Sequence, residues 1–74
     1  MEAKIRELMA EIFEVKEGQI SDDLEAKEVS WWDSIKHLSL ITALEEDFEI
    51  TLTMKEIQSM TSFNKIKDIV SRHL

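Results

Sequence analysis

The sequence predicts an all-α fold, a four-helix bundle with a long loop between helices 1 and 2 and a short third helix. Three observations lead to this fold class. The 74 residues include no proline and only one glycine, so the chain lacks the turn residues of a β-rich domain. Most of its common residues favour helices. Apolar residues also recur at helical spacing, and residues that can cap a helix precede several of these stretches. A chain of this length predicts one domain, residues 1–74.

The first helix is expected to stop near Val15, ahead of Gly18. Its apolar residues follow the spacing i, i+3, i+4, i+7, i+8 and form one stripe. These residues are Ile5, Leu8, Met9, Ile12 and Phe13. Residues 16–33 have no clean period and predict a long loop. Three apolar residues are spaced to hold this loop against a core, namely Ile20, Leu24 and Val29.

A second helix is predicted to begin at Asp33-Ser34, because the Asp33 carboxylate can accept hydrogen bonds from the unpaired N–H groups of a first turn. It should end around Asp47-Phe48-Glu49. Its apolar face is broad, which predicts packing against several neighbours. That face consists of Ile35, Leu38, Leu40, Ile41, Ala43, Leu44 and Phe48.

Two further helices are predicted from their caps. Thr53 and Glu56 have the spacing of a capping box and open a short helix. Its inward residues are expected to be Met54, Ile57 and Met60. Thr61-Ser62 then caps a last helix. Its apolar face is expected to comprise Phe63, Ile66, Ile69, Val70 and Leu74.

Composition excludes several functions. The net charge is −7, from 9 basic and 16 acidic residues, which argues against nucleic acid and favours partners with basic surfaces. Without cysteine the chain can form neither a disulfide nor a thiolate metal site, and His37 and His73 lack the spacing of metal ligands. No segment resembles a signal peptide or a membrane span. We therefore expect a cytoplasmic monomer without a metal.

One short segment stands out, Trp31-Trp32-Asp33-Ser34-Ile35. It puts a serine in the first turn of a helix, where an attached anion meets unpaired N–H groups and the positive helix end. Serine is common at helix starts, so this feature alone does not decide a function. No pocket with a catalytic pair is expected in so small a bundle, so we predict no enzymatic activity and no catalytic residues.

The chain resembles the acyl carrier protein family. That family has an Asp-Ser-Leu motif leading into a helix that ends near Ala-Leu-Glu-Glu-x-Phe, and this chain has Asp33-Ser34-Ile35 followed by residues 43–48, Ala-Leu-Glu-Glu-Asp-Phe. The likeness extends without gaps over nearly the whole chain. Phe13-Glu14-Val15 resembles the end of the family's first helix, and Ile50-Thr51-Leu52 and Met60-Thr61-Ser62 resemble its later turns.

The resemblance implies a carrier. Ser34 would receive 4'-phosphopantetheine from coenzyme A through a phosphopantetheinyl transferase, and Asp33 would be both helix cap and part of the recognition motif. Acyl groups would be held as thioesters on the thiol of this arm, and a cleft under the second helix could shelter them. Other partners would be acyl-loading and acyl-processing enzymes: a ligase, a synthase or a transferase. The positions implied to face partners are Ile35, Lys36, Thr42, Glu45 and Glu46.

The chain departs from fatty-acid carriers at three places. They commonly have small residues where this chain has Trp31-Trp32, and acids where it has Lys36 and Ser39. Because the first half of the second helix is neutral to basic, its electrostatic recognition by a fatty-acid synthase would be weaker. The Trp-Asp-Ser start and the His-Leu-x-Leu-Ile stretch resemble stand-alone carriers in specialised lipid, polyketide or related pathways.

Several alternatives stay open. Trp32 would either pack as a hydrophobic staple against the helix start or remain exposed to touch the arm or a partner. His37 is expected on the surface. A fatty-acid carrier is the nearest rival function. Outside the family, the alternatives are an interaction module with unmodified Ser34 and a small enzyme.

Overall fold

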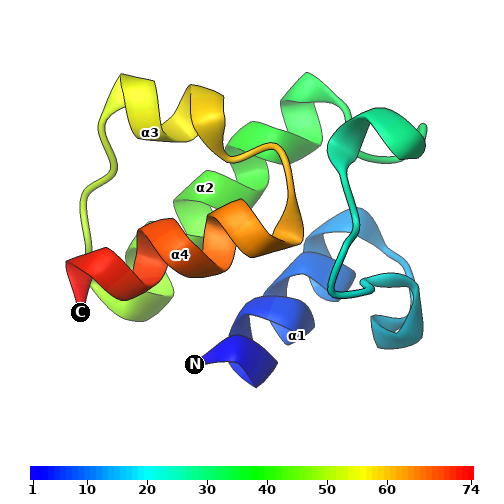
Figure 1. Ribbon diagram of the computed structural model, residues 1–74, viewed down its shortest axis with the longest axis horizontal. Coiled ribbons are helices and arrows are strands. Elements are labelled where there is room, and N and C mark those ends of the chain that lie inside the picture. Colours follow the sequence, from blue (N-terminus) through cyan, green and yellow to red (C-terminus); the bar gives the residue numbers. More distant parts are fainter.

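The computed structural model describes residues 1–74 and contains four α-helices and no strand. They are α1 (Glu2–Phe13), α2 (Ser34–Phe48), α3 (Met54–Ser59) and α4 (Phe63–His73). Between α1 and α2 lie two 3₁₀ turns, η1 (Glu17–Gln19) and η2 (Ala26–Glu28). Figure 1 shows the long α1–α2 connection wrapping round one end of the molecule. The predicted fold class is confirmed.

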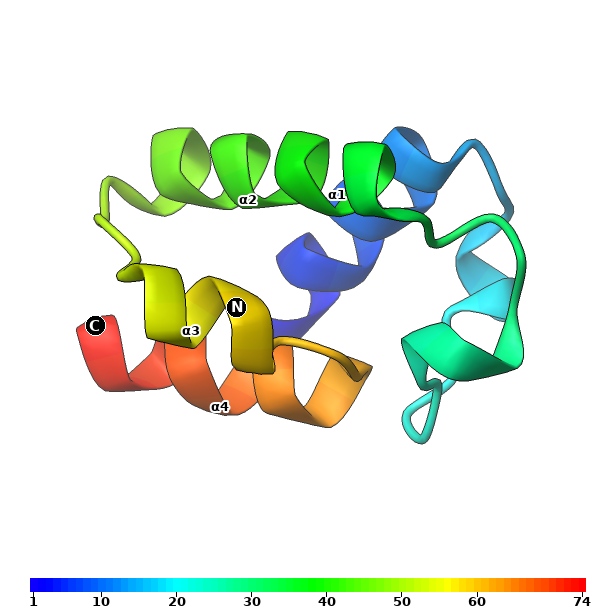
Figure 2. The same ribbon diagram turned by 90° about the horizontal axis from the view of Figure 1, so that it is seen from above.

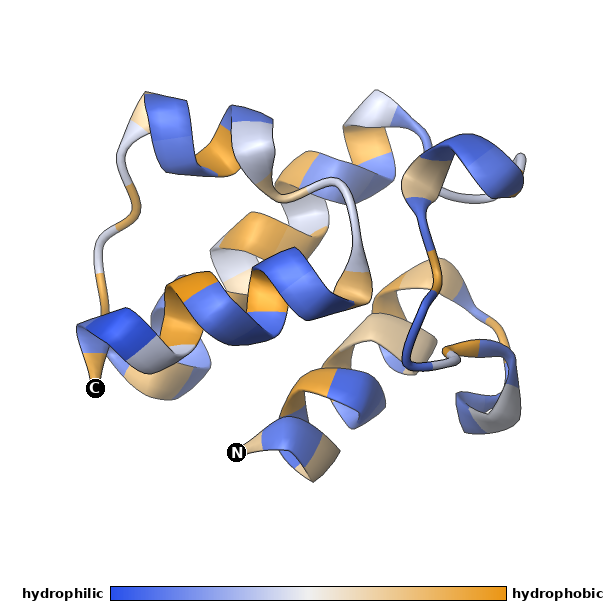
Figure 3. Ribbon diagram, in the orientation of Figure 1, coloured by the Kyte–Doolittle hydropathy of each residue, from blue (hydrophilic) through white to orange (hydrophobic).

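The helices enclose one apolar core. In Figure 2, α2 lies along one side of the molecule, and α3 and α4 lie along the other. The core cluster has 16 buried residues, and no buried residue is polar or charged. Figure 3 shows hydrophobic and hydrophilic residues alternating along α4, as expected for a helix with a single apolar face. The nine largest fully buried side chains are Ile5, Met9, Ile20, Leu40, Leu44, Met60, Phe63, Ile66 and Val70.

Both long N-terminal helices end on a glutamate in the left-handed conformation. Glu14 follows α1 with φ 58° and ψ 46°, and Glu49 follows α2 with φ 55° and ψ 50°. Their N–H groups bond back to the carbonyls of Ala10 and Glu45, as in the usual left-handed helix ending. Glycine is the residue that adopts this conformation without strain, and its absence explains why the sequence did not mark these two helix ends sharply.

The long loop is fastened to both α1 and α4. Ile20 and Leu24 are buried and Val29 packs partly buried against the core, as predicted. Arg6 of α1 donates to the Ile20 carbonyl and, over 2.7 Å, to the Asp22 carboxylate. The Ala26 N–H donates to the Thr61 carbonyl over 2.9 Å, which joins the loop to the start of α4.

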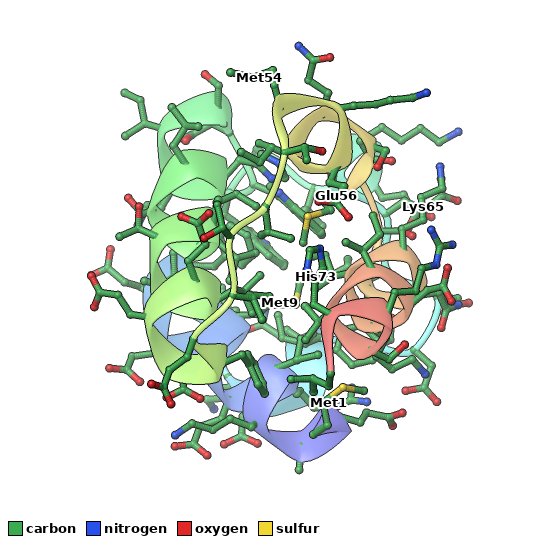
Figure 4. The ribbon with its side chains drawn as sticks, turned by 90° about the vertical axis from the view of Figure 1, so that its left-hand side faces the viewer. Met1, Met9, Met54, Glu56, Lys65 and His73 are labelled. Carbon is green, nitrogen blue, oxygen red and sulfur yellow. The ribbon has the colours of Figure 1, made fainter.

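Four predictions of inward apolar residues were wrong, and the first is Ile35, which is 77% exposed. Met54 is 68% exposed, Leu38 59% and Leu74 69%. Met54 is the first residue of α3 and lies at the edge of the molecule, whereas Met9 lies in the interior (Figure 4). Met60 is fully buried and Ile57 is partly buried, as predicted.

None of the four helices has the length and apolarity that crossing a bilayer requires. Nor do three or more His, Cys, Asp or Glu side chains gather where they could hold a metal ion.

Candidate functional site

Ser34 opens α2 as its first helical residue, and its side chain is exposed. The helix starts here because Asp33 caps it. Asp33 has an extended backbone, with φ −94° and ψ 178°, and its Oδ1 accepts from the Lys36 N–H over 2.8 Å. The first intrahelical bond runs from the His37 N–H to the Asp33 carbonyl over 2.8 Å, which leaves the N–H groups of Ser34 and Ile35 pointing out of the helix start. The predicted cap is confirmed.

A groove of about 390 Å³ opens beside Ser34. Its walls come from α2, from α3 and from the end of the long loop, and half of its lining residues are hydrophobic. The lining residues are Ala26, Trp32, Asp33, Ser34, His37, Leu38, Met54, Ile57, Gln58 and Thr61. Of these ten residues, only Trp32, Asp33 and Ser34 were predicted from the sequence as site residues. For Leu38 a signal was present, because a residue four positions after Ser34 lies on the same side of an α-helix.

Trp32 packs as a staple, the first of the two predicted readings. It is 7% exposed and immediately precedes the cap residue. Its ring lies 5.1 Å from that of Phe13 at an interplanar angle of 40°. On the other side it contacts His37, with ring centroids 6.2 Å apart. Trp31 is partly buried and packs 5.3 Å from Phe13. Trp32 therefore offers only a small edge to the groove.

The prediction that His37 is a surface residue was wrong. Its side chain is partly buried, and both ring nitrogens are engaged. Trp32 Nε1–H donates to His37 Nδ1 over 3.0 Å, and His37 Nε2 lies 2.8 Å from the Ile57 carbonyl of α3. The residue links the loop, α2 and α3 and is one of the residues that line the groove. No sequence signal identified this role, because the carbonyl partner belongs to another helix.

Lys36 is less available to a partner than predicted. Its Nζ donates to Glu14 Oε2 over 2.8 Å and to the Ile12 carbonyl over 3.3 Å. The hydrogen bond from Lys36 to the Glu14 carboxylate, followed by the attraction of the lysine charge, holds the pKa of Glu14 below its ordinary value of 4.5. Lys36 thus fastens the start of α2 to the end of α1, where a positive charge meets the negative helix end.

The remaining predicted partner positions divide into two kinds. Ile35 is 77% exposed, and Thr42 and Glu46 are also exposed, so all three can meet another protein. Thr42 Oγ1 additionally donates to the Leu38 carbonyl over 3.1 Å. Glu45 is partly buried, and its Oε2 accepts from the Leu52 N–H over 2.9 Å. Glu45 therefore holds the α2–α3 connection, which sequence reasoning did not predict.

Comparisons with known proteins agree with one another. A family model described as a phosphopantetheine attachment site matches residues 3–71. A protein named acyl carrier protein, from Buchnera aphidicola subsp. Baizongia pistaciae, is 31% identical over 74 residues, which are 100% of this chain and 95% of that protein. The solution NMR structure of holo acyl carrier protein from Geobacter metallireducens superposes with a TM-score of 0.85. It shares 21% identity and covers 97% of this chain and 83% of its own.

Proposed function

Since this chain belongs to the phosphopantetheine-binding acyl carrier protein family, we propose that Ser34 is the residue that bears its phosphopantetheine arm. Proteins of this family are carriers and not enzymes, and a covalent phosphopantetheine is their cofactor. Once attached, the arm supplies a thiol that holds an acyl group as a thioester. The family match favours this function over an unmodified interaction module.

The surroundings of Ser34 fit such an arm. Its side chain is exposed at the rim of the groove, so the hydroxyl is accessible to a transferase. The outward N–H groups of Ser34 and Ile35, together with the positive end of α2, favour a phosphodiester. The neighbouring Asp33 carboxylate is already bonded to the Lys36 N–H, which limits its repulsion of that phosphate. The exposed apolar side chains of Leu38 and Met54 offer contact surface to the arm.

As an acyl carrier the chain acts with a transferase and with acyl-processing enzymes. We place their contact surface around Ser34 and along the exposed side of α2. Ile35 and Leu38 supply its apolar part, and Thr42 and Glu46 continue it toward the helix end. Trp32, Lys36 and Glu45 contribute chiefly by fixing the shape of this surface, because each is held in an internal contact.

We further propose a specialised cargo or pathway in place of general fatty-acid synthesis. The support lies in the first two turns of α2. Residues 34–41 contain no Asp or Glu, and Lys36 and Ser39 occupy two of these positions. Lys36 is paired with Glu14, and Ser39 bonds to the Ile35 carbonyl over 3.2 Å. A basic partner that recognises acids in these turns would therefore associate more slowly with this carrier. Binding to a fatty-acid ketosynthase as tight as that of a fatty-acid carrier would contradict this part of the proposal.

The experiment is an intact-mass measurement after incubation with coenzyme A, Mg²⁺ and a promiscuous phosphopantetheinyl transferase. The wild type should gain the mass of one phosphopantetheine, and Ser34→Ala should gain none. Ser39→Ala is the matched control, because it removes another exposed hydroxyl of the same helix and should still be modified. Circular dichroism establishes that all three proteins are helical. A folded wild type that gains no mass would return the unmodified interaction module to first place.

A further inference from the structure

The groove beside Ser34 stops short of the core. The residues that line it include none of the nine fully buried side chains. Its least exposed lining residues are Trp32, which is buried, and Ala26, His37 and Ile57, which are partly buried. At about 390 Å³ its volume is near the lower end of the range for ligand pockets, and the arm itself must share that space.

His37 closes the space between α2 and α3 by two hydrogen bonds in series. An indole N–H can only donate, so His37 Nδ1 must be the acceptor in its 3.0 Å contact with Trp32. The neutral ring then carries its proton on Nε2, which donates to the Ile57 carbonyl over 2.8 Å. The His37 side chain of α2 thus connects the loop, at Trp32, to α3, at Ile57.

Moving this side chain aside is unfavourable. Rotation of His37 out of the gap would break both bonds at once and leave the Trp32 N–H and the Ile57 carbonyl without these partners in a partly buried place. It would also remove the ring from its stacked contact with the indole, at an interplanar angle of 26°. Beyond it, Leu40 and Leu44 are fully buried in a packed core.

We propose that His37 is a specificity-determining residue that bars the core to the cargo, so that this carrier shelters only short acyl groups, in the surface groove. The inference rests on the proposed attachment to Ser34. A short acyl group lies in the groove against Leu38 and Met54. Each further methylene of a longer chain stays in water and adds no stability to the folded protein.

The test uses a chain-length series. A promiscuous transferase loads the protein from acetyl-, butyryl-, octanoyl- and dodecanoyl-coenzyme A, intact mass verifies each product, and the melting temperature is measured. The wild type should reach its highest melting temperature by butyryl and stay level with longer chains. In His37→Ala the melting temperature should continue to rise with chain length, because the opened gap lets further methylenes be buried.

His37→Gln is the conservative control, since its amide offers one acceptor and one donor for the same two partners. It should restore the level profile of the wild type. The quantity compared is the change in melting temperature with acyl chain length, measured separately for each variant. A lower melting temperature of the unloaded variant therefore does not affect the comparison. A wild-type melting temperature that climbs steadily to dodecanoyl would overturn the inference, whether or not the variants fold.

A second readout locates the chain directly. With a ¹³C-labelled terminal methyl on the octanoyl group, wild-type spectra should show no nuclear Overhauser contact to the methyls of Leu40 or Leu44, and His37→Ala spectra should show such contacts. Contacts in the wild type would overturn the inference. Failure of any acyl arm to attach, seen in the mass spectrum, would instead contradict the proposed function at Ser34.

Discussion

Glu46 is the one acid in the last turn of α2 without an internal partner. Its neighbour Glu45 accepts from the Leu52 N–H, and Asp47 lies 3.8 Å from Lys4. A negative charge at a helix C-terminus is unfavourable because it faces the negative end of the helix dipole. An unpaired acid kept there at the expense of stability is what a partner-binding role would require.

Replacing Glu46 by Gln should therefore separate stability from binding. We expect Glu46→Gln to raise the free energy of unfolding by about 0.3–1 kcal/mol, since it removes the unfavourable charge. It should also lower kcat/KM for modification by the transferase. Urea unfolding and modification kinetics measure the two effects.

Glu11→Gln is the matched control for this residue. Glu11 is an exposed acid in the last turn of α1, with no internal partner, and it lies outside the proposed contact surface. It should gain similar stability and leave kcat/KM unchanged. Equal effects of both variants on kcat/KM would show that only the overall charge matters.

At the scale of the elements, the left-handed helix endings store strain. Glu49 and Glu14 both have positive φ, which costs a residue with a Cβ atom about 1–2 kcal/mol relative to glycine. Only one of them is compensated. Glu14 forms the ion pair with Lys36, whereas the Glu49 side chain is exposed and has no ion pair.

Glu49→Gly should stabilise the protein. Relief of the left-handed strain exceeds the greater freedom of glycine in the unfolded chain, for a net gain of about 0.5–1 kcal/mol. Glu14→Gly should gain less, because it also removes the partner of Lys36. Chemical denaturation of both variants checks this order, and an equal gain would mean that the Lys36 pair contributes nothing.

The helices could be predicted from the sequence because their causes are local. Asp33, Thr53 and Ser62 each cap the residues that directly follow, and each cap is found where it was predicted. The inward face of α3 was predicted only in part, because Ile57 is partly buried as expected and Met54 is not. In a helix of only six residues the apolar spacing does not define one side, so Met54 was placed in the core when it is in fact exposed.

The site was predictable only in part, for the same reason. Ser34 and its cap belong to one stretch of sequence. The groove beside them depends on contacts between segments that are distant in sequence, such as the bond from Ala26 to the Thr61 carbonyl. His37 and Ile57, 20 residues apart, are joined only once α2 and α3 have packed. Polar character alone suggested a surface position for His37.

At the scale of the whole molecule, a side-chain contact between Glu56 and His73 joins α3 to α4. Glu56 accepts from the Thr53 N–H over 2.9 Å in the capping box, and its other oxygen lies 2.9 Å from His73 Nε2 at the end of α4. Figure 4 shows Glu56 and His73 facing each other from these two helices. The backbone bond from Thr53, followed by the bond to His73, holds the pKa of Glu56 below its ordinary value of 4.5.

This arrangement predicts an acid-sensitive contribution to stability. A carboxyl group with a lowered folded-state pKa stabilises the protein above its unfolded pKa, and that stability is lost as pH falls through the folded value. Glu56→Gln should therefore be less stable than wild type at neutral pH and lose less stability below about pH 4.5. Thermal melts over a series of buffers measure the difference.

The control for this prediction is His73→Gln, which leaves the capping box in place. Because the Thr53 bond is the larger cause of the shift, this variant should keep most of the wild-type acid dependence. Identical pH profiles for Glu56→Gln and the wild type would contradict the role given to this carboxylate.

Trp32 is an intrinsic spectroscopic probe of the groove, because its ring is buried beside it. Its indole is wedged between Phe13 and His37, and its edge borders the groove. Fluorescence and near-ultraviolet circular dichroism of this ring respond to the polarity and packing around it, so a change of occupancy in the groove registers without any added label. Trp31 shares the Phe13 contact but is absent from the groove lining, and Trp31→Phe would isolate the signal from the site. Loading and unloading could then be followed in real time, in the unlabelled carrier, while its partner enzymes work on it.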